Sequence, residues 1–184
     1  IMNIRGTGAS DGVFANRNPD QQTIQDIYDA IEWLAGQEWC DGNVGMMGVS
    51  YLSVVQKRVA ALKPPHLKTI FAFYGWTEGY RDLFYHGGIF SHGFFSSWTR
   101  NRGPGMTIDK DLKAIMGEAD YSAALSRLRV DRELMSVPFL AEVINDPESG
   151  LHPLVLEVLI HSLDDDWHHE RAVDFSADDP IPAY

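Results

Sequence analysis

The sequence has little of three features that would each narrow its class. Among its 184 residues there is a single cysteine, Cys40, so a framework of intrachain disulfides is excluded. No uninterrupted apolar run approaches the ~18 residues that a membrane-spanning helix needs, so we expect no such span. Basic residues are scarce: 15 Lys and Arg stand against 26 Asp and Glu, a net charge of −11. A nucleic-acid binder that relies on phosphate contacts needs the opposite balance or a local basic patch, and neither is present.

The remaining composition is that of an ordinary globular protein, but its charge is unevenly spread. Residues 1–75 carry six basic and seven acidic side chains, whereas residues 76–184 carry nine and nineteen. The first part alternates short apolar runs with amphipathic segments, and the second is rich in aromatics and acidic helical patterns. We therefore expect a partial α/β core over residues 1–75, a helical insertion over 76–170 and a return toward the core sheet over 171–184.

The two ends of the chain resemble the interior of a longer protein. Residues 1–4, Ile-Met-Asn-Ile, already form an apolar strand-like run, and residues 181–184, Ile-Pro-Ala-Tyr, resemble the approach to another strand. A domain bounded in this way would leave sheet edges unpaired. We therefore expect these residues to be a segment of a longer protein. Its compartment stays open, with the cytoplasm favoured.

Hydrophobic periodicity predicts alternating strands and helices up to residue 74. Asn18 and Pro19 suit the N-cap and the first position of the first helix. The second strand lacks polar alternation, which is typical of a strand buried on both faces of a parallel sheet. Two consecutive strand–helix–strand units predict such a sheet. The expected elements alternate from strand to helix in this order: 1–4, 20–37, 44–48, 51–62 and 67–74.

Beyond residue 76 the periodicity becomes helical. Apolar spacing predicts helices within residues 108–135, at 137–144 and at 151–163. An Asn-Asp-Pro turn at residues 145–147 separates the last two. This part of the chain is expected to form an inserted helical cap on the sheet.

The sharpest chemical signal is Gly-Val-Ser at residues 48–50, between a predicted strand and a predicted helix. A serine at such a junction is typical of a nucleophile elbow, which points the hydroxyl away from the sheet. The helix start behind it offers N–H donors, with that of Tyr51 first, to a developing oxyanion. The alternative is that Ser50 only caps the helix. Leu52 stands where the general motif has glycine, which leaves both interpretations open.

A family resemblance is carried by residues 38–52, which end in Gly-Met-Met-Gly-Val-Ser-Tyr-Leu. They resemble the elbow region of the cocaine-esterase / X-Pro dipeptidyl-peptidase family of α/β-hydrolases. The family elbow is Gly-x-Ser-Tyr-x-Gly, so the departure moves from Leu52 to Ser53. Residues 5–12 resemble the family's Arg-Gly-x-Gly-x-Ser-x-Gly loop. Three further stretches resemble the start and exit of its helical cap: 80–82, 85–88 and 164–167.

The resemblance implies that this chain holds the nucleophile and the cap of an α/β-hydrolase. In the family, strands that precede the Arg-Gly-x-Gly loop carry a tyrosine that completes the oxyanion hole. The triad Asp and His follow the cap, on strands that would lie beyond Tyr184, and a β-sandwich usually follows them. The implied substrates are small acyl esters or amides, or X-Pro dipeptides, and no metal or organic cofactor is implied.

Other residues offer weaker alternatives. The order Ser, Asp, His is also satisfied by Ser50, the acidic run 164–166 and His168 or His169. The same cluster with His161 would contain metal-ligating residue types, although without tight ligand spacing. The glycines at 6 and 8 lack the third glycine of a dinucleotide loop, which favours a structural loop.

The aromatic residues between 71 and 98 have two interpretations as well. They either pack between sheet and cap or form a wall for an apolar acyl group or proline ring. Tyr51 and Trp76 are the candidates for such a wall, since one adjoins the elbow and the other follows the third strand.

Two functions follow from the sequence. The first is a serine hydrolase in which Ser50 forms an acyl-enzyme on a small ester, amide or peptide substrate, with Asp and His supplied from outside the segment. The second is a catalytically silent α/β-hydrolase-like binding module. Neither hypothesis involves nucleic acid or a membrane, and homo-oligomerisation stays open.

Overall fold

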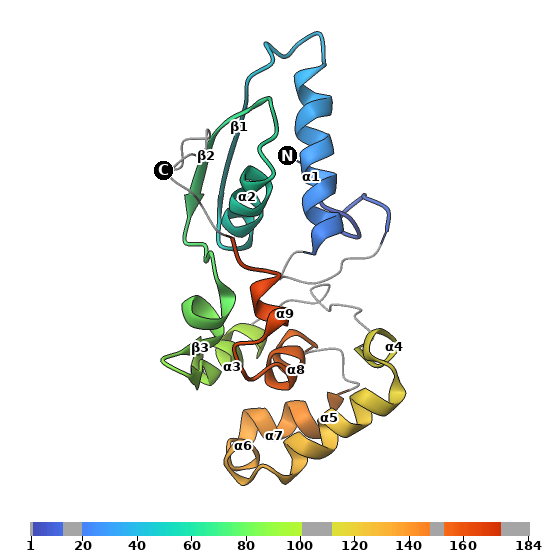
Figure 1. Cartoon of the computed structure of the whole chain (residues 1–184), viewed down its shortest axis with the longest axis vertical. Coiled ribbons are helices and arrows are strands. Elements are labelled where there is room, and N and C mark those ends of the chain that lie inside the picture. Colours follow the sequence, from blue (N-terminus) through green and yellow to red (C-terminus); the bar gives the residue numbers. More distant parts are fainter. Residues whose placement is uncertain (1, 13–19, 101–111, 148–152, 174–184) are drawn as a thin grey trace.

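The structure is a computed structural model that describes residues 2–12, 20–100, 112–147 and 153–173. The sheet with its two helices occupies one end of the long axis, and α5 to α7 occupy the other (Figure 1). The elements follow one another in this order: α1 (Gln21–Ala35), β1 (Val44–Val49), α2 (Tyr51–Ala61), β2 (Leu67–Phe73), η1 (Tyr80–Phe84), β3 (Tyr85–His86), β4 (Ile89–Phe90), α3 (His92–Arg100), α4 (Leu112–Met116), α5 (Glu118–Val130), α6 (Arg132–Ser136), α7 (Pro138–Asn145), α8 (Pro153–Ile160) and α9 (Asp166–His169).

Strands β1 and β2 pair in parallel, which confirms the predicted sheet type. The register runs from Val44 opposite Leu67 to Val49 opposite Phe73, with a shift after Val44. A shift of this kind lets Leu67 and Ile70 both face the helices although they are three residues apart. One cluster joins both helices to this face of the sheet, and its buried members are Ile24, Ile27, Ile31, Val55, Val59, Ala60, Leu67 and Ile70.

Helix α1 forms where its apolar stripe predicts it. Ile24, Ile27 and Ile31 lie on one face and are buried against α2 and the sheet. Its N-cap, however, is Asp20, whose carboxylate accepts a hydrogen bond from the Thr23 N–H at 2.8 Å. The prediction of Asn18 as N-cap is therefore wrong. Asp20, two residues further along and in an extended conformation, caps the helix instead.

No described element covers the opposite face of the sheet, so the predicted burial of residues 44–48 on both faces is not found within the described part of the chain. Met47 and its partner Phe71 are 79% and 50% exposed. Phe73 stacks on Phe71 with ring centroids 6.1 Å apart, and both residues are about half exposed. Helices α1 and α2 both lie on the other face, so in the described residues β1 packs against helices on one side only. Within the described residues, the β2 aromatics Phe71 and Phe73 are not packed between the sheet and the helical region.

The prediction of a strand at residues 1–4 is also wrong for residues 2–4. Their backbone groups bind within the following loop. The Asn3 carbonyl accepts from Ser10 Oγ at 2.8 Å, and the Ile4 carbonyl accepts from the Thr7 N–H at 3.0 Å. Ile4 still packs against the core. A strand needs a neighbouring ladder, and local turns have taken these groups instead.

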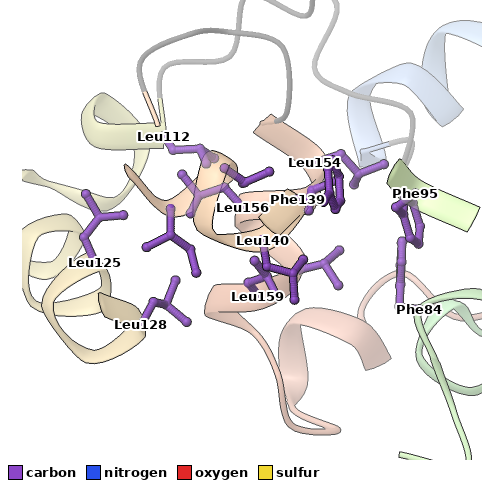
Figure 2. Close-up of a cluster of buried hydrophobic side chains, with 14 of the residues drawn as sticks. Phe84, Phe95, Leu112, Leu125, Leu128, Phe139, Leu140, Leu154, Leu156 and Leu159 are labelled. Carbon is purple, nitrogen blue, oxygen red and sulfur yellow. The ribbon is translucent and has the colours of Figure 1, made fainter. Parts of the chain in front are cut away.

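The second half of the described chain builds a separate core from helices. Figure 2 shows leucines of α5, α7 and α8 directed at one another, with the stacked rings of Phe84 and Phe95 at one side. Helices α5, α6 and α7 confirm the periodicity predicted for 108–135 and 137–144 in the described residues. Helix α8 ends at Ile160, three residues before the predicted limit. Within the described residues, none of the helices has the length and apolar character required to cross a membrane.

The stretch after β2 leads into the helical region through a single π-helical turn, η1, and the hairpin β3–β4. Tyr85 is buried at this junction, and its hydroxyl donates to the Val158 carbonyl at 2.9 Å. The chain returns after α9, where the Val173 N–H donates to the Thr77 carbonyl at 2.8 Å. The beginning and the end of the helical region therefore meet beside the sheet.

Candidate active site

Ser50 stands alone between β1 and α2. Its backbone has φ 61° and ψ −122°, a conformation that side-chain-bearing residues rarely adopt. Its side chain is exposed. Such strain costs on the order of 1–3 kcal/mol and persists only where the surroundings impose it. The turn therefore has the geometry that the Gly-Val-Ser motif predicts for an elbow.

The hydroxyl of Ser50 makes no hydrogen bond within the described residues, and it does not cap α2. The alternative that Ser50 serves only as an N-cap is therefore wrong. Its peptide groups, in contrast, are fully engaged. The Ser50 N–H donates to the Phe73 carbonyl at 3.1 Å, and the Ser50 carbonyl accepts from the N–H groups of Ser53 and Val54. The backbone is held on both sides, and the side-chain oxygen stays open.

Gly48 shows why the strand must approach the helix without a side chain. A Cβ at this position would lie 2.5 Å from the Cβ of Leu52, closer than real side chains come. The glycine of the motif is therefore required by the close approach of strand and helix. Leu52 itself is exposed, so the elbow has no steric need for glycine two residues after the serine.

Tyr51 opens helix α2 directly behind the serine. Its N–H is one of the first donors of the helix, which precede the first intrahelical hydrogen bond and carry the positive end of the helix dipole. Its ring packs against the cluster formed by α1, α2 and the sheet. This position suits the backbone of Tyr51 for an oxyanion and directs its ring toward the core.

Trp76 follows Gly75, which lies against the first turn of α2. A Cβ on Gly75 would lie 2.2 Å from Ser53 Oγ, so the segment after β2 crosses the first turn of α2 in direct contact. Lys57 stabilises this contact, since its Nζ donates a hydrogen bond to the Gly75 carbonyl at 3.1 Å. The indole of Trp76 is half-buried, with Nε1 beside Gly79. The structure thus brings the segment that carries Trp76 to the end of α2 where Ser50 lies, and the indole itself lies beside Gly79.

Burial and backbone hydrogen bonds shift the pKa values of Lys57 and Asp82, which lie next to the segment that follows β2. Burial lowers the pKa of the Lys57 ammonium, and Asp82 opposes that change. Burial raises the pKa of Asp82, but the N–H groups of Glu78 and Thr77 donate to its carboxylate and hold the pKa below its usual range. Asp82 is therefore a fixed anion beside the loop that carries Trp76.

The acidic run and the histidines near residue 165 form hydrogen bonds and ion pairs with one another and with Arg81. Asp164 is paired with Arg81 and, at 2.8 Å, with His169 Nε2. His168 is buried and donates from Nε2 to the His161 carbonyl at 2.7 Å. In the described part of the chain neither histidine bonds to Ser50. These contacts tie α9 to η1 and do not form the Ser–Asp–His arrangement that chain order alone permits.

A metal-binding alternative was open for the same cluster. Among the described residues, no three His, Cys, Asp or Glu side chains gather as a group that could hold a metal ion. His161 instead pairs with Asp165 at 2.9 Å and stacks on the indole of Trp167, with ring centroids 4.9 Å apart.

The glycine-rich loop at residues 5–12 is held against α1. Arg5 makes two hydrogen bonds of 2.7 Å to the carboxylate of Asp26, and a pocket of about 340 Å³ lies between this loop and the helix. The geometry agrees with the expectation of a structural loop. It presents no phosphate-binding lysine and precedes no adjoining helix start in the described residues.

Residues that the sequence motifs missed also shape the elbow. Gln56, Lys57 and Gly75 each bind or contact the elbow or the segment that crosses it. None belongs to a recognisable motif. The one available signal was a polar Gln56 on a helical face that otherwise carries valine, four residues after Leu52.

A serine held in a strained turn between a parallel strand and a helix, with a helical region following the sheet, defines a partial α/β-hydrolase fold. The sequence profile of the X-Pro dipeptidyl-peptidase (S15) family matches residues 1–176. The chain belongs to this family.

Named relatives agree with this membership. The chain is 33% identical over 168 residues to a cocaine esterase from Rhodococcus sp. (strain MB1 Bresler), covering 90% of this chain and 28% of that protein. It is 33% identical over 95 residues to an Xaa-Pro dipeptidyl-peptidase from Lactobacillus helveticus, covering 42% of this chain and 12% of the other. A crystal structure of a CocE/NonD family hydrolase from Staphylococcus aureus superposes with a TM-score of 0.57 at 29% identity, covering 92% of this chain and 23% of that one. The chain spans less than a third of the length of these relatives.

Proposed function

We propose that this chain carries the nucleophile of a serine hydrolase that cleaves small acyl esters or amides, X-Pro dipeptides among them. The carrying observation is the Ser50 backbone, held at φ 61° with its hydroxyl exposed and unbonded within the described residues. The names of the relatives, an esterase and a dipeptidyl-peptidase, support the two substrate classes.

The chemistry would begin with attack of Ser50 Oγ on the substrate carbonyl carbon. As the carbonyl oxygen gains charge, the N–H of Tyr51 would donate to it from the start of α2. The leaving alcohol or amine departs with a proton, and water then hydrolyses the acyl-enzyme to free Ser50. The base and its orienting carboxylate would come from outside this segment, as the family resemblance implies, and no described histidine bonds to Ser50.

The surrounding segments would shape the pocket. Trp76 supplies an apolar surface at the same end of α2 as the nucleophile, suited to an acyl chain or a proline ring. We also propose the division into a core over residues 1–75, a cap over 76–170 and a return over 171–184. It is supported by two separate hydrophobic clusters whose members fall on either side of residue 75.

A fluorophosphonate probe tests the assignment of the nucleophile. The full-length protein is expected to be labelled at Ser50, and Ser50→Ala is expected to abolish labelling. Ser96→Ala is the matched control, because Ser96 is a half-buried serine on α3 whose hydroxyl donates locally to the Gly93 carbonyl. Equal labelling of wild type and Ser50→Ala would contradict the proposal. A folded wild type that is never labelled would favour the catalytically silent binding module.

A further inference from the structure

Gln56 spans the nucleophile elbow from inside helix α2. Its Nε2 donates to the Leu52 carbonyl at 2.7 Å and approaches the Gly48 carbonyl at 3.4 Å. Gly48 lies two residues before Ser50 on the strand, and Leu52 lies two residues after it on the helix. One carboxamide therefore joins the two arms of the elbow across the serine.

The other hydrogen bonds at the elbow do not perform this task. They engage the peptide groups of Ser50 itself, through Phe73 on one side and through Ser53 and Val54 on the other. These bonds leave the angle between strand and helix to be set by the residues that flank the serine. A strained backbone keeps its conformation only when the surrounding contacts over-determine it.

If Gln56 served only to fill space, its buried carboxamide would lower stability relative to an apolar side chain. It is 1% exposed, and its Oε1 is buried with no hydrogen-bond partner in the described residues. Its neighbours Val55 and Val59 are apolar core residues. An aliphatic side chain of equal volume would fill the same space without an unmatched acceptor. What such a side chain would lose is the pair of contacts to Gly48 and Leu52.

We infer that Gln56 is a positioning residue, which holds the strand–helix angle and thereby places Ser50 Oγ for attack. This inference rests on the proposed function and adds a residue to it. A nucleophile displaced by a fraction of an ångström still binds substrate but reaches the transition state less often. The expected signature is a loss in kcat with little change in KM.

The test compares Gln56→Met with wild type in the full-length protein, using a short-chain p-nitrophenyl ester. Methionine conserves the volume and removes the donor. We expect kcat to fall on the order of 10-fold to 100-fold with KM within about twofold of wild type. Gln25→Met is the matched control, since Gln25 is an exposed glutamine on α1 whose amide donates to Asp29. It should change neither constant.

Two further measurements distinguish a loss of positioning by Gln56 from a loss of folding and from a failure of the proposed function. Amide hydrogen exchange over residues 48–52 should be faster in Gln56→Met at a temperature where the protein is folded, and Gln56→Leu serves if the methionine variant does not fold. An unchanged kcat in Gln56→Met, with Ser50→Ala inactive, would overturn the role of Gln56 alone. A rise in KM at constant kcat would overturn it as well. Retained hydrolysis in Ser50→Ala would instead remove the proposed function.

Discussion

Gly75 lies against Ser53 so closely that a Cβ on the glycine would stand 2.2 Å from the serine Oγ and 2.6 Å from its Cβ. This contact seats the segment after β2 on the first turn of the helix that begins behind Ser50. Ser53 is fully buried and its hydroxyl has no partner in the described residues, so the contact is steric and not a hydrogen bond. The position of the segment that carries Trp76 depends on this contact.

Gly75→Ala should therefore lower the free energy of unfolding, by about 1–3 kcal/mol as for other overpacked sites. The added methyl group meets a side chain and the Val54 backbone nitrogen at 3.2 Å, so it has little room to relax. Urea unfolding measures the change.

A double variant and a control define the cause. Adding Ser53→Gly to Gly75→Ala should restore much of the lost stability, because it removes the atoms in the way. Gly93→Ala on α3, where nothing lies within 4 Å of the new Cβ, should leave stability equal or slightly higher. If Gly75→Ala is as stable as wild type, the contact is looser than the structure shows.

The strain at Ser50 predicts opposite effects of glycine at two serines. Ser50→Gly should be more stable than Ser50→Ala by about 1 kcal/mol, because glycine adopts φ 61° without a Cβ clash and this outweighs its entropy in the unfolded chain. Ser96→Gly, inside helix α3, should be less stable than Ser96→Ala. Thermal unfolding of the four variants gives the comparison. Equal stability of the two Ser50 variants would show that the turn is unstrained.

The histidine next to the acidic run is expected to be dispensable for chemistry. His169 pairs with Asp164 and lies in α9, away from any bond to Ser50 within the described residues. His169→Gln should leave the rate of fluorophosphonate labelling within about twofold of wild type, while a lost catalytic base costs several orders of magnitude. A labelling rate reduced 100-fold or more in a folded His169→Gln variant would instead support a catalytic triad that includes His169.

The Arg5–Asp26 pair predicts a pH-dependent contribution to stability. Hydrogen bonds from the Arg5 guanidinium hold the pKa of the Asp26 carboxyl below its usual range, despite some desolvation. A carboxyl whose folded pKa is below its unfolded pKa stabilises the protein above the unfolded value, ~3.9. The contribution is lost as pH falls through the lower folded pKa.

Urea unfolding of wild type and Asp26→Asn from pH 7 down to pH 2 checks this expectation. The stability advantage of wild type should be largest near neutrality and shrink in acid. In Arg5→Gln, stability should depend less on pH over this range than in wild type, since the substitution removes the donor that lowers the pKa of Asp26. A difference between wild type and Asp26→Asn that stays constant with pH would contradict the assignment.

The sequence was sufficient where local pattern and backbone chemistry agree. The stripe Ile24, Ile27, Ile31 specifies α1, the apolar run before Ser50 specifies β1, and Pro64 and Pro65 end α2 before the next strand. The Gly-Val-Ser junction predicted a tight turn, because its spacing forces strand and helix together. These features depend on residues within a few positions of one another.

Tertiary structure decided everything that depends on what lies opposite a residue. Nothing local to residues 2–4 shows that their carbonyls bind Ser10 and Thr7 instead of a neighbouring strand. The exposure of Met47 and Phe71 follows from both helices lying on one face, which the apolar composition of β1 does not encode. The roles of Gln56 and Gly75 arise from contacts across the elbow. A sequence specifies periodicity and turn chemistry directly, whereas partners distant along the chain are selected only when the whole core is packed.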